Sequence, residues 1–111
     1  MASLRTLDPA VRPTAEWFVR TLERHGIAVT VTSTRRSLDE QKRLYAAYIS
    51  GRSKYPAAAP GKSTHGVGLA FDLHLEPPVY AGAGRLWELL GLTWGGRFGD
   101  EIHFDARALR R

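Results

Sequence analysis

The sequence predicts a small α+β domain in which helices pack on one face of a short, mostly antiparallel sheet. Two patterns support this fold class. Apolar residues recur at helical spacing over residues 11–22 and about 37–50, whereas residues 27–32 and 69–73 alternate with the two-residue period of a strand. The chain has 111 residues, of which 43% are hydrophobic and 24% charged. That size suffices for one core and leaves no room for a second, so residues 1–111 are predicted to form a single domain.

The N-terminal part of the chain is predicted to form a helix and then a strand. The helix begins at either Asp8 or Arg12, since each precedes a proline and suits a helix start, and it ends before Gly26. His25, just before that glycine, is then a helix-end residue rather than a metal ligand. Residues 27–32 are β-branched and alternating, as in a strand. The helix is expected to bury Val11, Ala15, Phe18 and Leu22.

The next helix is expected to open at a capping box, in which the side chains of Ser37 and Glu40 each satisfy a free backbone amide. It extends to about Ser50. Gln41, one turn after Ser37, would brace the loop that precedes the helix, or else be a plain surface residue. The apolar side chains expected to face inward are those of Leu44, Tyr45, Tyr48 and Ile49.

The second half of the chain is predicted to contain three strands and one short helix. Residues 51–62 are rich in turn formers and are expected to form a loop. The strand that begins near Leu69 is broken by the prolines that follow Glu76. After it we expect a helix over 85–90, short strands over 93–96 and 102–105, and a basic tail that is either frayed or docked.

The first candidate site lies in residues 61–73, G-K-S-T-H-G-V-G-L-A-F-D-L. His65 and Asp72 would be roughly 23 Å apart in an extended chain, whereas zinc binds His nitrogen and Asp oxygen at about 2.0–2.2 Å. Both reach one ion only if the chain folds back. Gly66 and Gly68 permit such a bend, because glycine adopts positive φ without a Cβ clash. The segment therefore predicts a ligand loop that leads into a strand with Asp72 on its polar face.

Residues 100–104, D-E-I-H-F, supply the remaining candidates. His103 would complete a set of three zinc ligands and leave the fourth tetrahedral position to water, as in catalytic zinc sites. Asp100 would be the general base on that water, with Glu101 as the competing residue, and either carboxylate could instead orient the histidine. His74, on the polar face of the preceding strand, is predicted to be an exposed histidine or else a substrate contact.

Three ordered blocks of the chain resemble a family of zinc peptidases that cut bacterial peptidoglycan. S-T-H-G-V-G-L-A-F-D, residues 63–72, is similar to the signature S-x-H-x-x-G-x-A-x-D, and D-E-I-H-F resembles the acid-x-x-His element. Residues 32–45 resemble S-G-Y-R-S-x-x-x-Q-x-x-L-Y, with Thr34 in place of glycine and Arg35 in place of tyrosine. The family comprises D-Ala-D-Ala carboxypeptidases and L-alanyl-D-glutamate endopeptidases and is related in fold to the Hedgehog signalling domain.

The resemblance implies a Hedgehog/DD-peptidase-like fold and one zinc ion held by His65, Asp72 and His103. It places the family's functional arginine at Arg36, with Arg35 as the alternative register. A positive charge there would stabilise the oxyanion that develops when an amide is cleaved.

The same resemblance implies substrate contacts and a choice of reaction. Ser63 matches the family serine that contacts substrate, although a turn serine bonded to its own backbone is the alternative. Trp94, beside two glycines, is expected to line the cleft or else to belong to the core. The compact Asp-x-x-His-Phe ending favours an L-alanyl-D-glutamate endopeptidase, similar to phage endolysins, over a D-Ala-D-Ala carboxypeptidase. A non-catalytic zinc-containing binding module is a further alternative.

The composition limits the kinds of metal ligand and of macromolecular partner that we expect. The chain has no cysteine, so a metal would use nitrogen and oxygen ligands. Sixteen Lys and Arg against 11 Asp and Glu give a net charge of +5, which attracts anionic polymers. The charges are scattered and no nucleic-acid motif occurs, so we expect no nucleic acid as a partner. The family resemblance, rather than the composition, implies bacterial peptidoglycan as the partner.

The expected location follows from two absent signals. No apolar run approaches the roughly 18 residues of a membrane span, and the first residues lack the apolar centre of a signal peptide. We therefore expect no membrane insertion. We also expect a monomer and no separate cell-wall-binding domain. The family resemblance implies action at the bacterial cell wall; together with the missing signal, it implies a protein made in the cytoplasm and released through holin pores or carried on a phage particle.

Overall fold

The centre of the fold is a four-stranded antiparallel sheet with the order β1-β2-β4-β3. The computed structural model describes residues 2–34, 38–54, 56–57, 59 and 67–110. The strands are β1 (Ala28–Ser33), β2 (Ala70–Glu76), β3 (Thr93–Trp94) and β4 (His103–Asp105). Their order and direction confirm the predicted α+β class with a short antiparallel sheet.

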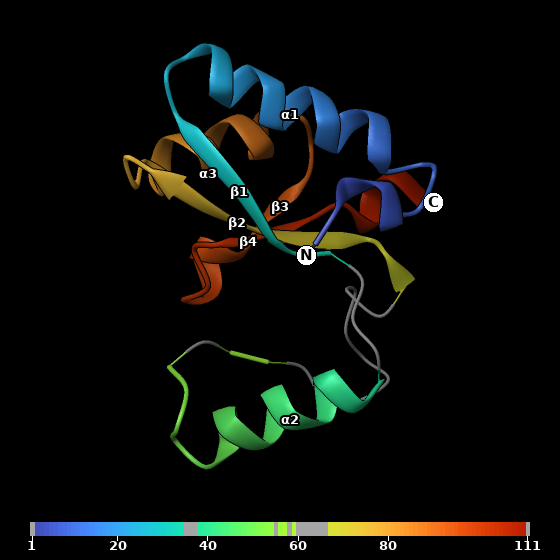
Figure 1. The fold of residues 1–111 in the computed structure, drawn as a ribbon, viewed down its shortest axis with the longest axis vertical. Helices are drawn as coiled ribbons and strands as arrows, with labels where there is room; N and C mark the ends of the chain where they lie inside the picture. The colour runs from blue at the N-terminus through green and yellow to red at the C-terminus, as the bar shows by residue number, and fades with distance from the viewer. Residues whose placement is uncertain (1, 35–37, 55, 58, 60–66, 111) are drawn as a thin grey trace.

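One face of this sheet packs against α1 (Arg12–Arg24) and α3 (Tyr80–Leu89), which Figure 1 shows side by side above the strands. The aromatic rings of Phe18, Trp87 and Phe104 meet there, with centroids 4.8 Å apart for Phe18–Trp87 and 5.2 Å for Phe18–Phe104. Burial of such rings stabilises the fold by about 1.5–3 kcal/mol per large side chain. The buried core consists of Leu7, Val11, Ala15, Phe18, Leu22, Phe71, Leu73, Leu75, Tyr80, Ala83, Trp87, Leu92, Phe104 and Ala106.

The first helix begins at the second of the two predicted starts. It spans Arg12–Arg24, with Pro13 in its first turn, where the missing amide hydrogen has no cost. Asp8 instead lies before the helix and accepts a hydrogen bond from the amide of Ala10 at 2.9 Å. At the other end Gly26 adopts φ +81°, as predicted for a helix stop.

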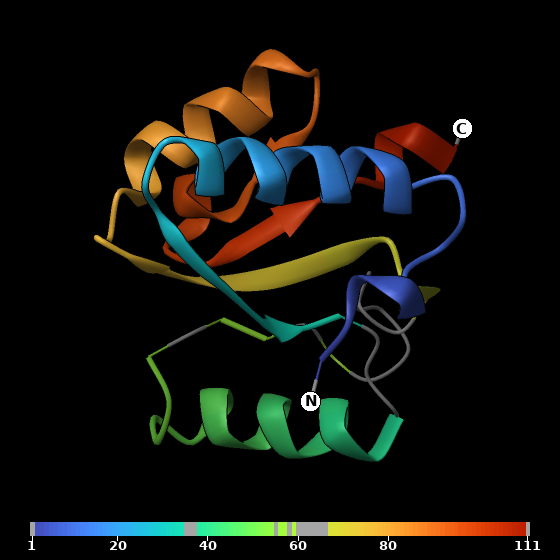
Figure 2. The ribbon, with the colours of Figure 1, turned by 45° about the horizontal axis from the view of Figure 1, so that its top comes forward.

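The helix α2 (Leu38–Ile49) lies across the sheet from α1 and α3, as Figures 1 and 2 both show. The prediction that the helices share one face is therefore wrong for α2. Its apolar residues were also expected to point inward, yet Leu44 is 39% exposed, Tyr48 40% and Ile49 64%. The physical reason is that α1 and α3 already cover the apolar face of the sheet. Among the α2 side chains that the structure describes, residues 39–49, the buried one is instead Gln41, at 3% exposure.

Helix α3 begins five residues before the predicted start. Two prolines and two glycines precede the predicted range 85–90, and such residues normally disfavour a helix interior. Gly84 is nevertheless helical and buried. A Cβ at this position would lie 2.1 Å from the indole ring of Trp94, so the close packing requires a glycine here. The glycine thus serves packing between α3 and β3 rather than a turn.

The two ends of the chain meet near the start of β2. The amide of Asp8 donates to the carbonyl of Gly68 at 3.0 Å, and the carboxylate of Asp8 pairs with the guanidinium of Arg110. Short 3₁₀ helices form at Leu4–Thr6 and Arg107–Arg110. The basic tail is therefore docked. Within the described part of the chain, no helix is both long and apolar enough to cross a membrane.

A matched pair of glycine substitutions in α3 tests this packing. Gly82→Ala, where a Cβ meets nothing within 4 Å, should raise the free energy of unfolding by about 0.5–1 kcal/mol, the usual gain in a helix interior. Gly84→Ala should lower it by roughly 1–3 kcal/mol, since the Trp94 ring must shift. Urea denaturation of both variants measures the difference, and equal stabilisation by the two would contradict the close contact.

Candidate active site

Asp72 and His103 form the centre of the candidate site. They are direct partners on adjacent antiparallel strands, β2 and β4, so their side chains project from the same face of the sheet. The Nδ1 atom of His103 lies 3.3 Å from Oδ1 of Asp72. Both side chains are largely buried, with 20% and 8% of their surfaces exposed. The pairing brings together two residues that are 31 positions apart in the sequence.

This pair lies on the sheet face opposite the apolar core. Phe71 and Phe104, the neighbouring pair in the same ladder, point to the core, and alternation sends Asp72 and His103 the other way. On the other side of β2, Asp72 pairs with Ser33, next to an irregularity of register at the end of β1. Bulges of this kind commonly re-aim side chains beside active sites.

The atoms of this pair fit a metal ion. Two ligands bound to one tetrahedral zinc at about 2.0–2.2 Å are separated by roughly 3.3–3.6 Å, and the measured distance between Nδ1 and Oδ1 is 3.3 Å. That distance is long for an N–H···O hydrogen bond, which is typically about 2.7–3.2 Å. No group of three metal-ligating side chains occurs among the described residues, and the third predicted ligand, His65, lies outside them.

Three other predicted site residues also fall outside the described ranges. These are Ser63, Arg36 and its alternative Arg35. The described chain resumes at Val67, and Gly68 then adopts φ +74°, the positive φ for which a glycine was expected; Gly66 lies outside the described residues. A Cβ on Gly68 would lie 2.9 Å from the amide nitrogen of Asp8, so glycine is required by space as well as by conformation.

Asp100 lies one turn before His103. Its carbonyl accepts the amide hydrogen of His103 at 3.1 Å, so residues 100–103 form a turn. The negative charge of Asp100 acts on the His103 ring. Glu101 is exposed, and its backbone carbonyl accepts the indole N–H of Trp94 at 2.8 Å.

The ring of His103 is surrounded by carboxylates. Burial lowers the pKa of His103, but the neighbouring carboxylates of Asp105, Asp72 and Asp100 outweigh that effect and raise the pKa to about 9. Asp105 and Asp72 are themselves buried, at 6% exposure each. Such concentrated negative charge around an imidazole favours a bound cation, either a proton or a metal ion.

Sequence reasoning missed two residues that shape this site. Asp105 lies two positions after His103 in β4, and the strand period alone would have placed both on one face. Gly95 packs under His103, since a Cβ there would lie 2.8 Å from the Cβ of His103 and 2.4 Å from the carbonyl oxygen of Asp100. No sequence pattern predicts that Gly95 packs against His103.

Trp94 does not share the face of the candidate site. It pairs with Phe104 across β3 and β4, so its ring lies on the core face, packed against Gly84 and Gly96. Its position therefore supports the alternative role in the core and gives no support to a substrate contact. The other histidines conform to their predicted roles. His25 contacts the carbonyl of Thr21 at the end of α1, and His74 is exposed and pairs with Glu76 at 2.8 Å.

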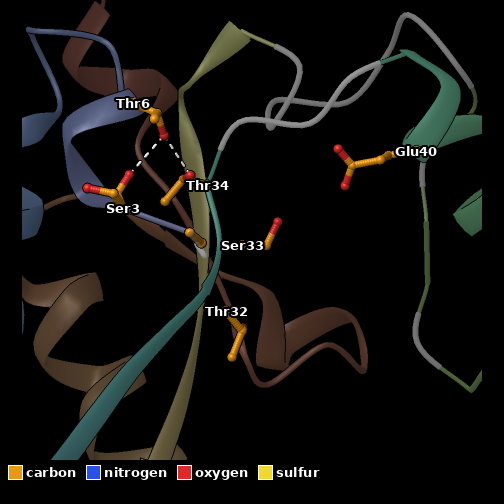
Figure 3. Close-up of a pocket in the computed structure, with 7 residues that line it drawn as sticks. Ser3, Thr6, Thr32, Ser33, Thr34 and Glu40 are labelled. Carbon is orange, nitrogen blue, oxygen red and sulfur yellow. Dashed lines mark hydrogen bonds between the residues drawn. The ribbon is translucent and has the colours of Figure 1, made fainter.

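A polar pocket of about 300 Å³ adjoins this face of the sheet. Figure 3 shows the hydroxyl groups of Thr6 and Thr34 in contact, 2.6 Å apart, with Glu40 of α2 on the opposite side. Its lining includes Ser33, the strand partner of Asp72, but not Asp72 or His103 themselves. The full lining is Ala2, Ser3, Thr6, Thr32, Ser33, Thr34 and Glu40.

Comparison with known families gives a match over most of the chain. The sequence model of the VanY family, D-alanyl-D-alanine carboxypeptidase, matches residues 4–81. The match includes Asp72 and ends before β4, so Asp100 and His103 lie outside it. A search of curated proteins gives no significant match.

Several solved structures share the fold. The vancomycin resistance D,D-pentapeptidase VanY, solved in complex with Zn(II), superposes with a TM-score of 0.68 and 18% identity over 90% of this chain and 72% of that one. The D,D-dipeptidase VanXYg, in complex with a D-Ala-D-Ala phosphinate analogue, superposes with a TM-score of 0.67 and 20% identity, over 90% of this chain and 50% of that one. For the LD-carboxypeptidase LdcB the TM-score is 0.63 and the identity 16%, over 94% of this chain and 62% of that one. The chain thus spans half the length of VanXYg and under two thirds of LdcB, and identities this low establish the fold alone.

The raised pKa of His103 predicts how the stability of the metal-free protein depends on pH. Because the pKa rises from 6.5 to about 9 on folding, the protonated ring stabilises the fold fully below pH 6.5, and this stabilisation is lost as pH rises through 9. The stabilisation of the fold by the protonated ring is on the order of 3 kcal/mol. Denaturation in the presence of chelator at a series of pH values measures it. His103→Gln should remove most of the slope, and an equal slope in that variant would contradict the assignment.

Proposed function

Because the chain belongs to the VanY D-alanyl-D-alanine carboxypeptidase family, we propose that it is a zinc-dependent peptidase that hydrolyses an amide bond in the stem peptide of bacterial peptidoglycan. The observation that supports this most directly is the pair of Asp72 and His103, 3.3 Å apart on the sheet face opposite the apolar core. Imidazole and carboxylate are ligands that zinc accepts, and Ser33, the strand partner of Asp72, lines a polar pocket. The net charge of +5 suits an anionic wall.

Three residues would hold one zinc ion in this proposal: Asp72 and His103 from the sheet, and His65 from the segment before β2. When bound, zinc in such a site lowers the pKa of a water ligand to about 7 and polarises the amide carbonyl. The sheet fixes two of the three ligands before any ion arrives, because both lie on paired strands. This preorganisation reduces the entropy lost on binding.

Asp100 is the proposed general base. It takes a proton from the attacking water and returns it to the leaving amine, which requires a carboxylate close to the ligand His103. The turn that joins the two residues, and the effect of the Asp100 charge on the His103 pKa, agree with that position. Arg36 would stabilise the negative charge on the carbonyl oxygen, and Ser63 would contact the substrate.

The bond that is cut has two candidates. Membership of the carboxypeptidase family favours removal of the terminal D-alanine from D-Ala-D-Ala, and the related VanXYg structure holds an analogue of that dipeptide. The Asp-x-x-His-Phe ending of this chain favours cleavage between L-alanine and D-glutamate instead. We place the carboxypeptidase first, because a family match over residues 4–81 is broader than a five-residue ending.

The reaction products separate these candidates. Incubation of isolated cell walls with the zinc-loaded protein should release D-alanine, and chelator should abolish the release until zinc is restored. Mass spectrometry of the digest identifies the cleaved bond. New L-alanine and D-glutamate ends would establish the endopeptidase, and a zinc-loaded protein that cleaves neither bond would indicate a binding module.

Substitution of the proposed base should separate catalysis from metal binding. Asp100→Asn should retain zinc and lower the rate of hydrolysis by about 10²–10⁴-fold, the usual contribution of general acid–base catalysis. Glu101→Gln is the matched control. Its exposed side chain should be dispensable, since the fold uses only its carbonyl group. Zinc content and hydrolysis rate are measured for both variants, and full activity in Asp100→Asn would exclude Asp100 as the base.

A further inference from the structure

Asp105 is a buried carboxylate that the proposed reaction does not use. It is the last residue of β4 and pairs with Ala70 on one side and Thr93 on the other. Only 6% of its surface is exposed. Burial of an ionised carboxylate is unfavourable unless it interacts with donors or positive charge, so the contacts of each oxygen indicate what the residue does.

The two oxygens of Asp105 face different groups. Oδ1 accepts the backbone amide hydrogen of Arg107 at 2.9 Å and lies 3.5 Å from the guanidinium Nε of the same residue. Oδ2 faces the ring of His103 and lies 3.9 Å from Nε2. The imidazole therefore stands between two carboxylates, with Asp72 beside Nδ1 and Asp105 beside Nε2.

We propose that Asp105 is a positioning residue for the metal site, which accepts the Nε2 hydrogen of His103 and so leaves the Nδ1 lone pair directed to the side of Asp72. This inference rests on the proposed metal site. Histidines that bind metals commonly donate their second ring N–H to a carboxylate, which fixes the tautomer and the ring orientation. At 3.9 Å the contact is longer than a direct hydrogen bond, so the ring and carboxylate close by about 1 Å or share a bridging water.

The two oxygens of Asp105 allow its role in orienting His103 to be tested separately from its role in stabilising the fold. The contact of Oδ1 with the amide of Arg107 stabilises the start of the C-terminal 3₁₀ helix and does not involve His103. An asparagine at position 105 retains one carbonyl oxygen for that amide. Its NH₂ group would then face Nε2 and, as a donor, favour the tautomer with the hydrogen on Nδ1, where the metal should bind.

Zinc affinity measured by competition with a chromophoric chelator tests the proposal. At one fixed pH, Asp105→Asn should bind zinc about 10–100-fold more weakly than the unmodified protein, the usual effect of removing such a partner. Arg107→Ala is the matched control, because Arg107 contacts only Oδ1, and it should remain within threefold of the parent. Affinity within twofold in Asp105→Asn would overturn the role of Asp105. Failure of the unmodified protein itself to bind zinc would overturn the metal site, and this inference with it.

A second measurement needs no substitution and holds even if Asp105→Asn does not fold. Nitrogen NMR of the histidine rings in the cadmium-loaded protein identifies the metal-bound atom through its coupling to cadmium. For His103 we expect coupling at Nδ1 and a hydrogen on Nε2. Cadmium on Nε2, or an Nε2 without hydrogen, would overturn the proposal.

Discussion

The cross-strand pair of Asp72 and His103 is the contact on which the proposed site depends. The two residues are far apart in the sequence, and each is held in place by its strand. The antiparallel ladder between β2 and β4 sets them opposite each other, and a one-residue slip of either strand would turn that strand's site residue towards the core. The chemistry of the site is thus fixed by a backbone hydrogen-bond pattern.

The apolar core protects that register. Phe71 and Phe104 are paired one position along the same ladder, with centroids 5.8 Å apart and ring planes nearly parallel, and both are fully buried. Exposing two such rings to water would cost several kcal/mol. The stabilising face of the sheet therefore determines the geometry of the face where catalysis is proposed.

On that second face, negative charge is concentrated around one imidazole. Asp72, Asp100 and Asp105 all act on His103, and their combined effect outweighs the burial of the ring. Like charges so close together repel one another when no cation is present. A site of this composition is suited to a cation. Gly95 allows the backbone to pack closely against His103, and this close packing holds the histidine in place.

The sequence by itself determined the fold class, the strands that hold the site, and the membership of Asp72 and His103 in one candidate centre, because strand period and motif spacing are local properties of the chain. It could not determine that α2 lies across the sheet from the other helices, that Trp94 faces the core, or that Asp105 stands beside His103. Those facts depend on which face of the sheet was already covered and on which strands became neighbours. Such choices are made by the packing of residues far apart in the sequence, and only the tertiary structure contains them.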